Sequence, residues 1–145
     1  PYADEERQKR IRRELVRMST MGKFKGVTPR LLPRFLSPAA LQNETLASAV
    51  MAMGEAVGQH NFALQQEAIM NRREQMGTLA QFHKPSLVLC GDLDELTPPE
   101  LAHEMAGVLR DAELVILPDV GHLSAMEAPD EVTAALLRLI DRIAT

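Results

Sequence analysis

Two loops of this 145-residue chain carry an acid and a histidine at positions that favour joint chemistry. The loop Gly91–Pro99 follows a short apolar run and contains Asp94, and the loop Val120–Ser124 follows another apolar run and contains His122. In an open parallel sheet, the loops after neighbouring strands meet at the same edge. A histidine oriented by an aspartate acts as the general base that activates a serine. The spacing therefore predicts two members of a catalytic triad, Asp94 and His122.

The same loops hold alternatives to this assignment. Asp92 is suited to bonding the backbone amides of its own turn, and Glu95 to facing solvent near a helix start. The third triad member is not evident, because no serine or cysteine of the chain lies in a Gly-x-Ser-x-Gly sequence or its cysteine equivalent. Ser124 follows His122 closely and is expected to form hydrogen bonds within its own loop.

The other histidines and the single cysteine are expected to be structural or solvent-facing. This applies to His60, to His83, which precedes Lys84 and Pro85 in a linker, and to His103, which falls inside a predicted helix. Cys90 ends a buried strand. Glu127 is expected to tie the histidine loop to the last helix. No pair of histidines or carboxylates has the spacing of a metal site such as His-Glu-x-x-His, so we predict neither a metal nor a cofactor.

The elements that would position these residues are those of an α/β fold. Residues 86–90 and 113–117 are short apolar runs typical of buried parallel strands. Thr97–Glu100 supplies an N-cap, a first-turn proline and a capping-box glutamate for a helix over 98–110, and a last helix is predicted over 129–143. The inward face of that last helix is predicted to be Val132, Leu136, Leu137 and Ile140. Because two strands do not make a stable open sheet, we expect the chain to be part of something larger.

The first 82 residues have a different pattern, with helices separated by proline and glycine. The periodicity predicts an amphipathic helix over about 4–21, a short one from Ser37, a third from Asn43 with a break at Gly58, and a fourth over about 61–73. Six of the eight methionines fall here, which indicates ordinary helix packing or, alternatively, an adaptable wall over a substrate pocket. The candidate pocket residues are Met51, Met53, Phe62 and Met70.

Charge is divided unevenly between these two parts. Residues 1–82 hold 12 Lys and Arg against 8 Asp and Glu, a net of +4, and residues 83–145 hold 4 against 12, a net of -8. The basic cluster Arg7–Arg17 could bind nucleic acid or a membrane, but Glu6 and Glu14 are spaced for pairing with Arg10 on a solvated helix face. We therefore expect no nucleic acid and no membrane among the partners.

The overall composition favours a globular, cytoplasmic protein. Hydrophobic residues make up 46% and charged residues 25%, and no apolar run approaches the roughly 20 residues of a membrane helix. The first residues are polar and lack the apolar core of a signal peptide. A single cysteine forms no internal disulfide, which favours a reducing compartment.

The two loops resemble those of the α/β-hydrolase family, in particular its esterase and lactonase branch with a helical lid. Gly91–Pro99 is similar to the family's loop after the seventh strand, which carries the triad acid, and Gly121–Pro129 to the loop after the eighth strand, which carries the triad histidine. The resemblance implies the C-terminal portion of such an enzyme, with residues 1–82 as the lid and 83–145 as the end of the α/β core. It also favours Asp94 over its neighbours as the acid.

The resemblance implies hydrolysis of an ester or lactone carbonyl by a Ser-His-Asp mechanism. The nucleophile and the oxyanion hole would lie upstream of Pro1, so the missing N-terminal half of the fold is an expected partner and the isolated chain is expected to be inactive. Dehalogenases and carbon–carbon bond hydrolases share these loops and remain open. The alternative from another class is a non-catalytic binding or assembly module, in which a free sheet edge and uncovered apolar helix faces drive self-association.

Overall fold

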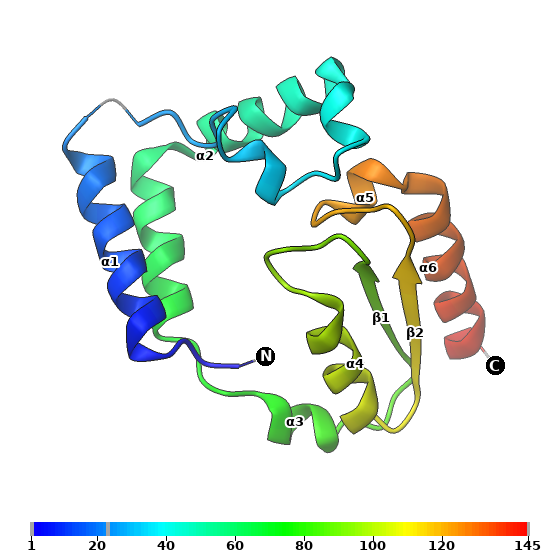
Figure 1. Ribbon diagram of the computed structural model, residues 1–145. Helices are drawn as coiled ribbons and strands as arrows, with labels where there is room; N and C mark the ends of the chain where they lie inside the picture. Colours follow the sequence, from blue (N-terminus) through cyan, green and yellow to red (C-terminus); the bar gives the residue numbers. More distant parts are fainter. Residues whose placement is uncertain (1, 23, 145) are drawn as a thin grey trace.

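The computed structural model describes residues 2–22 and 24–144, which form a helical region and a smaller strand–helix region (Figure 1). The helical region contains α1 (Glu6–Thr20), the 3-10 turns η1 (Leu32–Arg34) and η2 (Ala40–Gln42), α2 (Glu44–Met70) and α3 (Met76–Ala80). The strand–helix region contains β1 (Ser86–Gly91), α4 (Pro99–Val108), β2 (Ala112–Leu117), α5 (Ser124–Glu127) and α6 (Pro129–Ala144). The α/β class is confirmed, and so is the succession of strand and helix in the second half. The short helices α3 and α5 were not predicted.

Helix α1 lies alongside the C-terminal half of α2 (Figure 1). Arg12 of α1 joins the two, because its guanidinium bonds the buried carboxylate of Asp4 and the side chain of Gln66 on α2, the latter at 2.9 Å. The apolar stripe that made α1 amphipathic in sequence, Ile11, Leu15 and Met18, is exposed. Helix α1 therefore contacts its neighbour mainly through polar groups.

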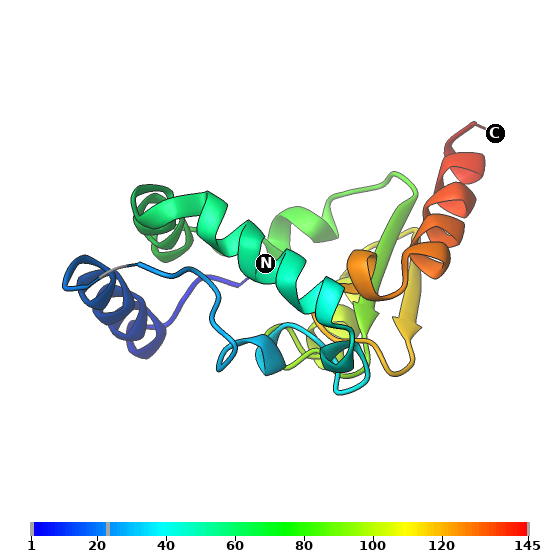
Figure 2. The same cartoon turned by 90° about the horizontal axis from the view of Figure 1, so that it is seen from above.

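Helix α2 begins and breaks where the sequence predicts. The Asn43 side chain caps it by accepting a hydrogen bond from the Leu46 amide at 3.1 Å. Gly58 has φ 71° and ψ 164°, which interrupts the helix in a conformation that only glycine adopts readily. The two predicted helices on either side of Gly58 form a single kinked helix, whose arms run in different directions, the second of them beside α1 (Figures 1 and 2). None of the described helices is long and apolar enough to cross a membrane.

Strands β1 and β2 pair in parallel, with Ser86 opposite Ala112 and Gly91 opposite Leu117. Side chains alternate between the two faces of this pair, as they must in a strand. Val88 and Cys90 pack against Ala102 of α4, and Leu89 packs in the cluster that includes Val132 of α6. One helix thus covers each face. Because the strands are parallel, their ends and the loops that follow lie at the same edge.

The predicted inward face of α6 is wrong for three of its four residues. Val132 packs against the sheet, but Leu136, Leu137 and Ile140 are 47%, 56% and 58% exposed. The helix contacts the sheet through Val132 and the fully buried Ala135 instead. A two-stranded sheet is narrower than the apolar stripe of α6, so part of that stripe has no partner within the described residues.

Candidate active site

The structure brings Asp94 and His122 into direct contact. Nδ1 of His122 lies 2.9 Å from Oδ2 of Asp94. Asp94 follows the end of β1 and His122 follows the end of β2, and these strands are parallel neighbours, so the two loops lie side by side. The Asp94 side chain is 5% exposed and the His122 side chain 32% exposed. The acid is therefore buried while the histidine retains access to other molecules.

Both oxygens of the Asp94 carboxylate accept hydrogen bonds from the protein. Oδ1 accepts from the amides of Leu96 and Thr97 at 2.8 and 2.9 Å, and Oδ2 accepts from the Thr97 hydroxyl at 2.7 Å. Burial raises the pKa of Asp94, but the bonds from Thr97, His122 and Leu96 outweigh it and hold this pKa below its usual range. The group is therefore ionised at neutral pH and acts only as an acceptor.

The Asp94 carboxylate determines which nitrogen of the His122 ring carries the proton. Because an ionised carboxylate only accepts, Nδ1 of His122 donates, and in the neutral ring Nε2 then carries a free lone pair. Nε2 makes no hydrogen bond within the described residues. The ring borders a cavity of about 210 Å³ whose lining includes Gly91, Met105 and Ser124. An imidazole in this state is a general base open to a hydroxyl group.

Thr97 is the residue of this site that the sequence did not reveal. It was predicted as the N-cap of the following helix, but α4 begins at Pro99 and its N-cap residue, Pro98, makes no side-chain cap bond. The Thr97 hydroxyl donates to Asp94 instead and lies 3.4 Å from Nδ1 of His122. A hydroxyl three residues after the acid was the available signal, and helix capping competed for the same residue.

The alternative site residues in these loops are placed differently from Asp94. Asp92 accepts from the amide of Val120 at 3.3 Å, so it joins the two loops and does not bond its own turn. Glu95 is exposed. Ser124 borders the same cavity as His122, but no hydrogen bond joins the two side chains. Among the described non-glycine residues only Asp119 has a positive φ, so the strained turn of a serine nucleophile is not found there.

Two glycines allow the loops to approach this closely. A Cβ on Gly91 would lie 2.1 Å from the carbonyl oxygen of Val120, and a Cβ on Gly121 would lie 2.7 Å from the amide nitrogen of Ser37. Real Cβ atoms do not come so near to backbone atoms. The glycines beside the acid and the histidine are thus required by packing of backbone on backbone.

Cys90 is buried at the end of β1 and borders the same cavity. Burial, followed by the negative charge of Asp94, raises its pKa to about 11. The thiol therefore stays protonated at neutral pH, which makes it a poor nucleophile. Within the described residues, no three His, Cys, Asp or Glu side chains gather in a way that would hold a metal ion.

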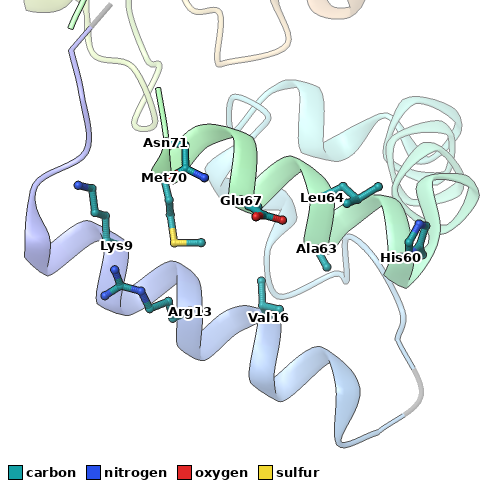
Figure 3. A pocket seen from close by; sticks show the side chains of 9 residues that line it. All are labelled: Lys9, Arg13, Val16, His60, Ala63, Leu64, Glu67, Met70 and Asn71. Carbon is teal, nitrogen blue, oxygen red and sulfur yellow. The ribbon is translucent and has the colours of Figure 1, made fainter. Parts of the chain in front are cut away.

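The four candidate pocket residues do not line the cavity beside His122. Met51 packs against the buried cluster of the helical region, and Met53 is exposed. Phe62 contacts Phe24 with ring centroids 5.3 Å apart and ring planes tilted by 39°. Met70 borders a separate cavity of about 480 Å³, where it extends from α2 toward α1 (Figure 3). Their contact with a substrate stays a prediction.

The remaining histidines lie away from the two loops. His60 borders the cavity between α1 and α2 (Figure 3), and His83 and His103 are exposed.

The fold is that of an α/β hydrolase. Residues 61–138, more than half of the chain, match the model of the TAP-like protein family, and the chain belongs to this family of α/β hydrolases. "Lipase 1" of Psychrobacter immobilis is 34% identical over 68 residues, which are 47% of this chain and 22% of the lipase.

Solved structures extend the likeness to almost the whole chain. A thermophilic esterase from Thermogutta terrifontis, with malate bound, superposes with a TM-score of 0.91 at 25% identity, over 99% of this chain and 53% of that one. An enol-lactonase from Burkholderia xenovorans gives a TM-score of 0.66 at 25% identity, over 77% of this chain and 43% of that one. The chain thus spans about half the length of these enzymes.

Proposed function

We propose that this chain supplies the acid and the base of a Ser-His-Asp hydrolase that acts on an ester or lactone carbonyl. The observation that carries the proposal is the bond between Asp94 and Nδ1 of His122, which leaves Nε2 as a free acceptor beside a cavity. The names of the relatives, a lipase, an esterase and an enol-lactonase, support carboxylic esters and lactones as the substrate class.

In the proposed reaction His122 moves the protons and Asp94 holds the ring. As a serine oxygen bonds to the carbonyl carbon, Nε2 takes its proton, and the buried carboxylate of Asp94 stabilises the imidazolium that forms. The same proton then passes to the leaving alcohol as the carbon–oxygen bond of the ester breaks. Water attacks the acyl-enzyme with His122 again as base, which releases the acid and restores the serine.

The nucleophile belongs to a polypeptide segment outside residues 1–145 in this proposal. Each of the two strands has one edge that is unpaired within the described residues, and a further parallel strand beside β1 would extend the sheet. Such a strand would end at the same edge as Asp94 and bring its following loop toward the cavity. The isolated chain then lacks both the attacking oxygen and the oxyanion donors, and we expect it to be inactive.

We propose that residues 1–82 form the lid of this enzyme and residues 83–145 the end of its core. The support is the contact between the two regions at the site itself. The Phe35 carbonyl accepts from the amides of His122 and Leu123 at 3.0 and 3.1 Å, and Leu123 packs against the buried cluster that includes Leu36. A lid attached directly to the histidine loop is positioned to cover a bound substrate. The single cysteine fits a cytoplasmic location for the enzyme.

The test is hydrolysis of p-nitrophenyl acetate and of a simple lactone by the protein expressed from its complete reading frame. We expect turnover that is lost in His122→Ala and retained in His103→Ala, which removes an exposed histidine from α4. The 145-residue chain alone should show no turnover. Equal activity of the two variants would refute the assignment of His122, and turnover by the isolated chain would refute the external nucleophile.

Self-association is a second candidate, favoured by the exposed apolar residues of α6. Leu136, Leu137, Ile140 and Ile143 form an apolar stripe with no partner in the described residues. If this stripe and the free strand edge pair two copies of the chain, the isolated chain sediments as a dimer. If they normally contact the rest of a hydrolase, the complete protein sediments as a monomer while the isolated chain associates.

A further inference from the structure

The backbone of the histidine loop is held by acceptors that come from outside the loop. Four consecutive amides donate hydrogen bonds. The amide of Val120 bonds Asp92, that of Gly121 bonds Glu127, and those of His122 and Leu123 both bond the Phe35 carbonyl. The peptide units before and after His122 are therefore both fixed, and the direction of its Cα–Cβ bond with them.

Glu127 differs from the other acceptors because one of its oxygens accepts from an amide of each region of the chain. Its Oε2 accepts from the Gly121 amide at 3.1 Å and from the Ser37 amide at 3.0 Å. Ser37 belongs to the buried turn between η1 and η2, and Gly121 immediately precedes His122. The bond to Gly121 ties the loop to α5, directly before the last helix, and the bond to Ser37 adds a connection with the helical region that the sequence did not predict.

The carboxylate is enclosed on its other side. Oε1 of Glu127 is buried and has no hydrogen-bond partner within the described residues. A Cβ on Gly121 would lie 2.9 Å from Oε1 and the same distance from the carbonyl carbon of Leu36. The side chain therefore fills a space between the loop and the helical region that leaves no room for a larger residue at position 121.

We propose that Glu127 is a positioning residue that holds the histidine loop on the segment 35–37, so that the ring of His122 meets Asp94. Its effect on turnover rests on the proposed function, whereas its effect on the bond between His122 and Asp94 does not. Displacement of the segment 35–37 would remove the Ser37 donor from this oxygen and the Phe35 acceptor from the amides of His122 and Leu123. The helical region and the base would then move together.

The chemistry of the contact predicts an ordered series of variants. Glu127→Gln keeps a carbonyl oxygen at the position of Oε2 and so keeps both amides bonded. Glu127→Asp keeps the charge but is one methylene shorter, so it does not reach both amides. Glu127→Ala leaves both amides without an acceptor. The proposed role therefore depends on an acceptor oxygen that reaches both amides, and it does not depend on the negative charge.

The first measurement is the low-field proton resonance of His122 Nδ1–H in the complete protein, which reports its bond to Asp94. We expect the resonance to persist in Glu127→Gln and in the control Glu131→Gln, which makes the same change at an exposed position in the first turn of α6. It should disappear in Glu127→Asp and Glu127→Ala. If Glu127→Ala does not fold, the comparison of Gln with Asp decides, and an inverted order of those two overturns the proposal.

The second measurement is the kinetics of the complete enzyme. We expect Glu127→Ala to lower kcat by on the order of 100-fold, the effect of misplacing a catalytic group by about 1 Å, with little change in KM. Glu127→Gln should restore most of this loss. Wild-type kcat in a folded Glu127→Ala variant would overturn the positioning role. An inactive complete wild-type protein would instead refute the proposed function, and the resonance would still decide the role of Glu127.

Discussion

Replacing Asp94 by asparagine tests how the structure uses the charge of this side chain. Oδ1 of the new amide still accepts from Leu96 and Thr97, and the Thr97 hydroxyl can rotate to accept from Nδ2. The ring of His122 cannot keep its state, because Nδ1–H would face an N–H donor. It must move its proton to Nε2, which removes the free lone pair that the proposed base requires.

The cost to stability is the difference between two large terms. Four hydrogen bonds to Asp94 change from charged to neutral, at about 1 kcal/mol each. The neutral side chain also avoids the desolvation of a carboxylate that is 5% exposed, which returns several kcal/mol at most. We expect a net loss of about 1–2 kcal/mol for Asp94→Asn, against about 3–5 kcal/mol for Asp94→Ala, which leaves buried donors unpaired.

The pH dependence gives this prediction its sign. The pKa of Asp94 is lowered in the folded chain, so its contribution to stability is fully present above the unfolded-state value of about 4 and is lost as the pH falls through the folded-state value. The difference in unfolding free energy between wild type and Asp94→Asn should therefore shrink between neutral pH and about pH 3.

The assay is urea unfolding of the isolated chain across this pH range, monitored by circular dichroism. A difference that grows toward low pH would refute the reasoning. In the complete enzyme the wrong tautomer should lower kcat by about 10⁴-fold, the loss seen for this substitution in a serine protease triad. Turnover near the wild-type value would refute the assigned proton position.

Three further variants or reagents probe the same loops. Cys90, with its pKa raised to about 11, should resist iodoacetamide at slightly alkaline pH in the folded chain and react once urea unfolds it; labelling before unfolding contradicts the burial. Gly91→Ala should cost several kcal/mol because its Cβ would meet the backbone, whereas Gly107→Ala in an open helical position should gain about 0.5–1 kcal/mol, both measured by urea unfolding. Thr97→Val should raise the pKa of Asp94, measured by carbon NMR titration, since it deletes a donor that lowers that pKa; an unchanged pKa refutes the role of the hydroxyl.

The sequence predicts those parts of the fold whose signals are local. The two strands, the Asn43 cap and the Gly58 break each depend on a few adjacent residues, and each is found in the structure. The prediction of the inward face of α6 is wrong because the apolar stripe of this helix is wider than the surface it contacts. The two-stranded sheet covers only part of that stripe. The pattern was read correctly as apolar but could not say which neighbour would cover it.

The candidate site likewise contains residues that the sequence predicts and residues that it does not. Asp94 and His122 could be paired from sequence because parallel neighbours place their following loops together, whatever the side chains between them. Thr97 was missed because two local roles compete for one hydroxyl, and the choice depends on where the acid lies in space. Glu127 contacts Ser37, which is 90 residues away along the chain, so no local pattern connects them.

The groups that hold the loop of His122 therefore come from more of the chain than the groups that bond Asp94. Asp94 needs only its own turn and His122, but the loop of His122 depends on Phe35, Asp92 and Glu127, contributed by three separate segments. These three residues together accept from four consecutive amides of the loop, Val120 to Leu123. In the proposal for Glu127, the helical region therefore helps to orient the ring of His122, in addition to its proposed role as a lid.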